Sequence, residues 1–115
     1  MKSLKNSIAM LILMGAALFV AWTSFQAAPP PDGADLYKQK CAMCHKADGR
    51  GYPALKTPDL TDPNWQKNAK DKDIEASIKN GKKGTAMPAF ADKLKDDEIK
   101  VLVGYLRSLD SSKKK

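Results

Sequence analysis

Both cysteines of the chain and its only histidine lie within five consecutive residues, Cys41-Ala42-Met43-Cys44-His45. The chain has 115 residues. An apolar N-terminal segment leaves roughly 85 of them for a folded domain, which is near the lower limit for a self-sufficient hydrophobic core. Domains of this size commonly depend on disulfides, a metal or a cofactor. Two cysteines allow at most one disulfide, so the chemistry of this short segment decides what else can hold the domain together.

The spacing of these residues is the signature of covalent haem attachment. Two thiols separated by two residues can reach the two vinyl groups on one edge of a porphyrin. The residue that follows then places an imidazole beneath the iron. We therefore predict one haem c, attached through Cys41 and Cys44, with His45 as a ligand to the iron.

Three other uses of the same residues are weaker. A structural zinc site needs four protein ligands, whereas two cysteines and one histidine supply three. A redox dithiol of the thioredoxin type requires a βαβ pattern, which the sequence lacks, and it leaves His45 unexplained. A disulfide between Cys41 and Cys44 closes a loop too short to stabilise the fold much.

Met87 is the candidate for a second axial ligand, because the chain has a single histidine and bis-histidine ligation is excluded. The other methionines belong to the N-terminal segment or to the attachment motif: Met1, Met10, Met14 and Met43. The alternative is that Met87 fills a gap in the core. Its position between the loop-forming residues Gly84 and Pro88, away from any periodic apolar face, favours ligation.

Residues 1–28 have the layout of a secretory signal peptide, with Lys2 and Lys5 before an apolar run at residues 8–22. The uncharged stretch at residues 8–28 is also long enough to span a bilayer, so an uncleaved membrane anchor remains the alternative. Either reading puts the remainder outside the cytoplasm, and we predict a periplasmic protein, soluble or tethered to the inner membrane. Three prolines at residues 29–31 form a stiff linker.

The formal net charge of +7 is compatible with nucleic acid, anionic lipid or an acidic protein as a partner. Direct base readout depends strongly on arginine, and the chain has only two, Arg50 and Arg107. No aromatic residues interleave with a basic stripe, which argues against nucleic acid. Residues 111–115 form a lysine-rich tail beyond the domain.

The periodicity predicts an all-α domain. We expect a helix over residues 32–44 with Asp32 as its N-cap, and another over residues 71–80 that stops at Gly81. The strongest apolar repeat predicts the last helix over residues 96–109, with Asp96 as its cap. Residues 46–69 and 81–90 are expected to be loops, and no stretch shows the alternation of a strand.

Over residues 32–110 the chain resembles the class I monohaem c-type cytochromes of bacteria, including small periplasmic cytochromes and the haem domains of terminal oxidase subunits. The resemblance implies three to four helices wrapped around one covalently bound haem, with the first and last helices crossing. It rests on residues 33–37, on the attachment motif with Gly49 and Gly51, on Thr57-Pro58-Asp59-Leu60, and on Gly84-Thr85-Ala86-Met87-Pro88-Ala89-Phe90 followed by Tyr105-Leu106.

The same resemblance implies roles for several residues. The carbonyl of Pro58 would accept a hydrogen bond from the haem-ligating imidazole and so fix its orientation. Leu60 would line the haem face, and Trp65 would lie near the haem propionates. Gly33 and Tyr105 would pack the first helix against the last.

Because histidine and methionine together would saturate the iron, the implied function is single-electron transfer through an exposed haem edge, without enzymatic activity. We expect a monomer that meets a reductase and an oxidase of a respiratory chain through acidic patches on those partners. The lysines expected to face them are Lys40, Lys46, Lys79, Lys82 and Lys83. Lys46 departs from the family, which usually has glycine directly after the haem histidine.

Two alternatives share the same attachment site. The chain could be an anchored cytochrome subunit fixed in a larger respiratory complex, which would differ from a free carrier only in residues 1–28. It could instead be a haem enzyme or gas sensor with a labile sixth ligand. This alternative predicts that no methionine permanently ligates the iron. The absence of a second histidine from the sequence weakens this last reading.

Overall fold

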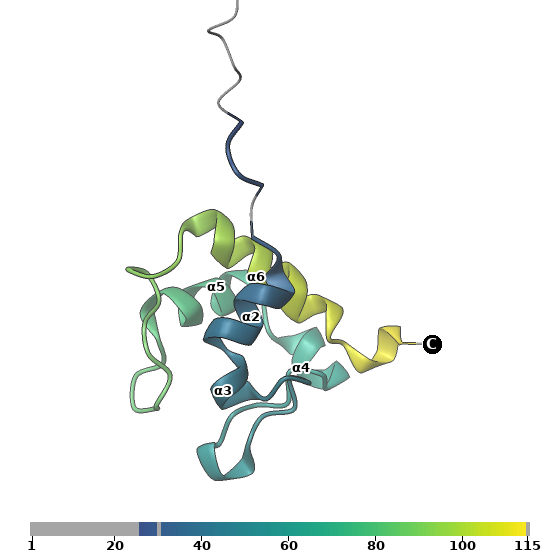
Figure 1. The fold of residues 1–115 in the computed structure, drawn as a ribbon. Helices are drawn as coiled ribbons and strands as arrows, with labels where there is room; N and C mark the ends of the chain where they lie inside the picture. The colour runs from purple at the N-terminus through teal and green to yellow at the C-terminus, as the bar shows by residue number, and fades with distance from the viewer. Residues whose placement is uncertain (1–25, 30, 115) are drawn as a thin grey trace, which may run out of the picture.

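The computed structural model describes residues 26–29 and 31–114 (Figure 1). These residues form α-helices and short 3-10 turns without a strand, so the all-α prediction is confirmed. None of the helices in this part of the chain is long and apolar enough to cross a membrane. The signal peptide or anchor predicted for residues 1–28 falls almost wholly outside the described residues.

The helix predicted for residues 32–44 is in fact two helices, α2 (Gly33–Lys40) and α3 (Ala42–His45). Asp32 caps α2 as expected, because its carboxylate accepts a hydrogen bond from the backbone N–H of Ala34 at 3.2 Å. The interruption lies at Cys41, whose φ of −118° is outside the helical range. The chain therefore bends between α2 and the short helix that carries Cys44 and His45.

A helix that the sequence interpretation missed, α4 (Pro63–Asn68), lies within the segment predicted to be a loop. The Asp62 carboxylate accepts a hydrogen bond from the backbone N–H of Asn64 at 2.9 Å and caps the helix. Pro63 occupies its first turn, where a missing N–H does no harm. The rest of the segment is loop, apart from one 3-10 turn at Pro53–Leu55.

The two remaining helices are α5 (Asp71–Asn80) and α6 (Asp96–Ser108), close to the predicted limits. The prediction that Asp96 caps α6 is wrong. The N-cap is Lys95, whose backbone N–H donates to a carboxylate oxygen of Glu98 at 2.7 Å. A glutamate three residues after the cap satisfies this orphan donor as one half of a capping box, so no side-chain acceptor is required at the cap itself.

The first and last helices, α2 and α6, cross at the centre of the fold (Figure 1). Gly33 makes the close approach possible. A Cβ atom at this position would lie 2.9 Å from both Tyr105 Cβ and the carbonyl oxygen of Val101. The rings of Tyr37 and Tyr105 pack nearby with their centroids 5.2 Å apart. The predicted contact of Gly33 and Tyr105 at this crossing is confirmed.

A single cluster of buried apolar side chains extends from this crossing to α5 and the loops. It includes the predicted apolar face of α6. Its members are Leu36, Tyr37, Leu60, Ile74, Ile78, Leu94, Ile99, Leu102, Val103, Leu106 and Leu109. Several of them also form the wall of a cavity on one side of the cluster.

Candidate cofactor site

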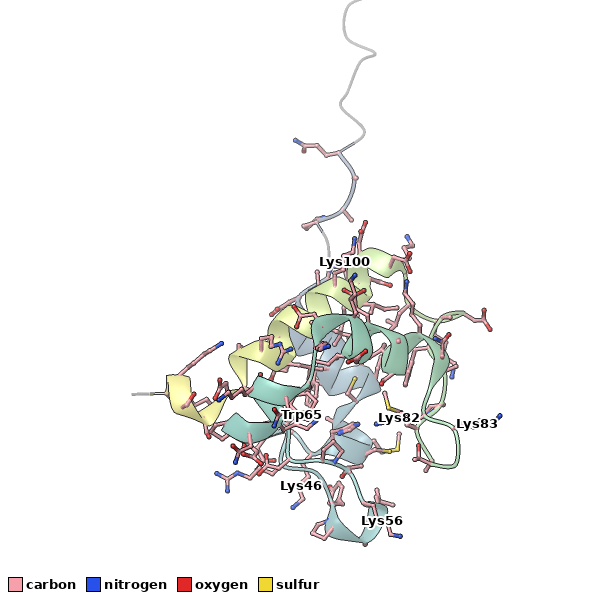
Figure 2. The ribbon with its side chains drawn as sticks, turned by 180° about the vertical axis from the view of Figure 1, so that it is seen from behind. Lys46, Lys56, Trp65, Lys82, Lys83 and Lys100 are labelled. Atoms are coloured by element: carbon pink, nitrogen blue, oxygen red, sulfur yellow. The ribbon has the colours of Figure 1, made fainter. Side chains whose placement is uncertain are left out.

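A cavity of about 170 Å³ opens between α2, α4, α5, α6 and the two long loops, and its lining is mainly apolar. It brings together segments that are far apart in the sequence. All the predicted site residues except Cys44 line it, namely Cys41, His45, Pro58, Leu60 and Met87. Trp65 lines it as well, and Figure 2 shows Trp65 on the same face of the molecule as Lys82.

The thiols of Cys41 and Cys44 are free and half-buried. Burial, followed by the proximity of Cys44, raises the pKa of the Cys41 thiol to about 11. The two sulfurs are not joined in a disulfide in this structure. In the part of the chain that the structure describes, no group of three or more His, Cys, Asp or Glu side chains is placed to hold a metal ion.

The backbone that carries His45 is held by Tyr37, a contact that the sequence interpretation did not identify. The Tyr37 hydroxyl donates to the carbonyl oxygen of Lys46 at 2.7 Å and lies 3.3 Å from that of His45. Burial raises the pKa of Tyr37 well above its usual range, so the hydroxyl stays protonated and remains a donor. The backbone N–H of Gly51 donates to the His45 carbonyl at 3.0 Å.

Lys46 takes a backbone conformation that normally favours glycine, with φ at +63°. This is a physical reason why glycine suits the position directly after His45, and a larger residue there costs of order 1–3 kcal/mol. The Tyr37 hydrogen bond to its carbonyl holds the strained residue in place. The Lys46 ammonium also lies 4.9 Å from the centre of the Tyr52 ring, a cation–π contact.

Gly51 allows the loop that carries Pro58 to lie against the segment after His45. Its φ is +71°, and a Cβ atom there would lie 2.8 Å from the Thr57 carbonyl oxygen and 2.9 Å from that of Pro58. Only glycine fits so close to two backbone carbonyls. This packing brings Pro58 to the cavity wall beside His45.

The imidazole of His45 is half-buried, and burial lowers its pKa, which favours the neutral ring with a free lone pair. Its Nδ1 atom is buried and, within the described part of the chain, has no hydrogen-bond partner. The predicted bond to the Pro58 carbonyl is therefore not formed in this structure and stays a prediction. A buried ring nitrogen without a hydrogen-bond partner is unusual in a protein core, and it leaves Nδ1 available for that bond.

A second contact absent from the sequence interpretation fastens α4 to α6. The buried amide of Gln66 donates to the carbonyl oxygens of Leu60 and Leu106 at 2.7 and 2.8 Å. The Arg107 guanidinium in turn donates to the Gln66 carbonyl at 2.6 Å. Because Leu60 and Trp65 line the cavity, this network holds one of its walls in place.

These observations fit a haem c. An apolar cavity is lined by a neutral imidazole and a thioether, which are the side chains that ligate haem iron in electron carriers. Of the two free thiols with the required spacing, that of Cys41 lines the cavity. The neutral state of His45 leaves the lone pair that a metal ligand requires.

Comparison with known proteins identifies the family of the chain. Residues 28–106 match the family model described as cytochrome c oxidase, cbb3-type, subunit III. The cbb3-type cytochrome c oxidase subunit FixP of Rhizobium meliloti (strain 1021) is 32% identical over 101 residues, which are 86% of this chain and 35% of the relative. Subunit CcoP of Rubrivivax gelatinosus is 38% identical over 72 residues, which are 63% of this chain and 23% of the relative. The chain thus spans about a third or less of these relatives.

Solved structures show the same fold. The KustC0563 c-type cytochrome superposes with a TM-score of 0.66 at 32% identity, covering 70% of this chain and all of that one. Cytochrome cL of Methylophaga aminisulfidivorans MPT has a TM-score of 0.58 at 29% identity, covering 68% of this chain and 51% of that one. The chain therefore belongs to the family of cbb3-type cytochrome c oxidase subunit III, and it has the fold of a c-type cytochrome domain.

Proposed function

We propose that the chain carries one haem c, which Cys41 and Cys44 would attach through thioether bonds and whose iron His45 and Met87 would ligate. The observation that carries this proposal is that His45, Met87 and Cys41 line one apolar cavity, although Met87 comes from a distant loop. The domain that uses this site is residues 32–110, after a linker at 29–31 and before the lysine tail at 111–115.

When bound, the haem supplies a one-electron couple between ferric and ferrous iron. Two protein ligands leave no open position for a substrate, so the role is outer-sphere electron transfer. The Met87 thioether favours the ferrous state and raises the potential relative to two histidines. The apolar side chains of Leu60 and Leu102 at the cavity exclude water, which disfavours the more highly charged oxidised state.

We place the domain outside the cytoplasm, tethered or released according to whether residues 1–28 are retained. A second arrangement has support of its own, because the matched relatives are named as subunits of a cbb3-type oxidase. In that arrangement the domain is a fixed subunit of a respiratory complex rather than a diffusing carrier. Both arrangements use the same site, and the mass of the mature N-terminus together with co-purification from membranes separates them.

Covalent attachment is tested by expressing the chain together with a haem-maturation system. One haem per chain should survive extraction with acidified acetone and add its mass to the denatured protein. Cys41→Ala and Cys44→Ala should each lose one thioether bond and mature poorly. Met43→Ala is the matched control, because Met43 lies between the two cysteines and is 84% exposed. Complete extraction of the haem from the parent protein would contradict the proposal.

A further inference from the structure

The loop that carries Met87 is pinned to the end of α5. The backbone N–H of Phe90 donates to the Ile78 carbonyl at 2.9 Å, and that of Ala91 donates to the Lys79 carbonyl at 3.2 Å. Within the loop, the N–H of Lys82 donates to the Met87 carbonyl at 3.3 Å. The backbone of Met87 therefore lies directly beside the residues that follow α5.

Gly81 makes this close packing possible. Its φ of +69° and ψ of −174° fall in a region that is essentially restricted to glycine. A Cβ atom at Gly81 would lie 2.7 Å from the Met87 carbonyl oxygen, 2.9 Å from the carbonyl carbon of Pro88 and 3.0 Å from the nitrogen of Ala89. All three are backbone atoms, which cannot rotate away as a side chain can. Any larger residue at 81 must displace the Met87 backbone.

Thr85 holds the same backbone from within the loop. Its hydroxyl donates to the Lys82 carbonyl at 2.7 Å and accepts from the N–H of Met87 at 3.3 Å. The Thr85 side chain therefore connects Lys82 to Met87. The N–H of Thr85 also donates to the Lys82 carbonyl, at 3.1 Å, and closes a tight turn.

We propose that Gly81 and Thr85 are positioning residues that hold the Met87 backbone where its thioether can ligate the iron. The proposal rests on the proposed function, since it takes Met87 as the axial ligand. A methionine side chain has three rotatable bonds and settles readily into alternative positions. Fixing its backbone in advance removes part of the ordering cost of ligation. Gly81 and Thr85 supply that restraint without contacting the iron.

The first test uses Gly81→Ala in the haem-loaded protein. We expect loss of the sulfur-to-iron charge-transfer band of the ferric protein and a lower reduction potential. Imidazole should bind about tenfold more tightly, because its apparent affinity rises with the fraction of molecules whose sixth position is free. Gly84→Ala is the matched control: its φ is +78°, but a Cβ atom there meets nothing within 4 Å. This variant should keep the band and the imidazole affinity of the parent.

The second test uses Thr85→Ala, which adds no atom and so avoids the steric strain of Gly81→Ala. It should weaken the band and tighten imidazole binding, while Thr85→Ser, which keeps the hydroxyl, should restore both. Ser108→Ala is the matched control, because the Ser108 hydroxyl makes the same kind of bond to a carbonyl three residues earlier, at 2.6 Å, but within α6. Helical circular dichroism and haem content confirm that each variant is folded.

The outcomes separate this inference from the assignment of the ligand. If Met87→Ala abolishes the band while Thr85→Ala and a folded Gly81→Ala both behave like the parent, Met87 is the ligand and the positioning role is wrong. Should Gly81→Ala fail to fold, the Thr85 pair decides the question. If the band survives in Met87→Ala, another group ligates the iron, and the proposed function and this inference fall together.

Discussion

At the scale of single residues, Thr61 orders the segment that brings Pro58 and Leu60 to the cavity. Its hydroxyl donates to an oxygen of the Asp59 carboxylate at 2.6 Å, and its backbone N–H donates to the same oxygen at 2.9 Å. The side-chain hydrogen bond is the main cause that lowers the pKa of Asp59 below its usual range. Leu60 is also held, because its N–H donates to the Gly49 carbonyl at 2.8 Å.

This contact predicts how stability depends on pH. A carboxyl group whose pKa is lower in the folded than in the unfolded protein stabilises the fold above its unfolded pKa, and the contribution disappears as pH falls through the folded value. Thr61→Val removes the hydroxyl and keeps the shape. The parent should therefore be more stable than the variant at neutral pH, and the difference should shrink below about pH 4. Urea unfolding across a pH series measures it, and a constant difference would contradict the prediction.

The sequence identified some site residues better than others. Cys41, Cys44 and His45 follow from a local motif, and Met87 follows by elimination from the composition. The hydrogen bonds of Tyr37 and Gln66 could not be predicted, because the sequence around a tyrosine or a glutamine does not show which distant carbonyls its side chain meets. The Gln66 amide, for example, bonds a carbonyl 40 residues away. Such contacts depend on the tertiary arrangement of α4 and α6.

At the scale of elements, the crossing of α2 and α6 depends on one small residue. Gly33→Ala would place a methyl group 2.9 Å from Tyr105 Cβ and from the Val101 carbonyl oxygen, so the helices must separate. We expect a loss of about 1–3 kcal/mol in the free energy of unfolding, the usual range for overpacking a tight site. Denaturant unfolding of the haem-loaded protein measures this change.

Gly104→Ala is the control for that experiment, because Gly104 lies in α6 but a Cβ atom there meets nothing within 4 Å. Replacing an exposed helical glycine with alanine should stabilise the protein by roughly 0.5–1 kcal/mol. Opposite signs for two identical substitutions would identify the close approach as the cause. Equal effects would mean that helix propensity, rather than packing, sets the stability at both positions.

Helices with long periodic faces were predictable, whereas short ones were not. The apolar repeat of α6 and the glycine that ends α5 located both within a residue or two. In contrast, α4 has six residues, of which Trp65 is the only large apolar one, so no periodicity can develop. An aspartate followed by proline, Asp62 and Pro63, was the available signal for its start. The bend at Cys41 had no comparable signal, since the sequence pattern that predicts a helix runs through residues 32–44 without a break.

At the scale of the whole molecule, positive charge lies around the face that holds the cavity. Figure 2 shows Lys46 and Lys56 beside one edge of this face and Lys82 and Lys83 beside another, with Lys100 at the far end of the domain. Lys79, one of the lysines expected to face a partner, forms an ion pair within the domain. The Lys79 ammonium pairs with the Asp96 carboxylate at 2.8 Å and links the end of α5 to the start of α6.

This distribution predicts salt-dependent reaction with an acidic redox partner. Electrostatic steering acts mainly on association rates and is screened over about 8 Å at physiological ionic strength. Stopped-flow electron transfer should therefore slow as salt rises. Reversing Lys82 and Lys83 to Glu should slow it further at low salt, with little change in potential. Reversing Lys100 and Lys113 instead makes the same change in net charge and should have a smaller effect. Rates independent of salt in all three proteins would mean that these lysines do not steer a partner and only keep the surface solvated.

The crossing of α2 with α6 also sets the order of events when the chain is made. Helix α2, which opens the domain, packs mainly against α6 at the other end of the sequence. It therefore cannot make these contacts until residues 96–108 have been synthesised. Polypeptides grow at about 5–20 residues per second, which leaves Cys41 and Cys44 in an open chain for several seconds. Until residues 96–108 are present, the segment that holds both cysteines and His45 therefore has no completed fold around it.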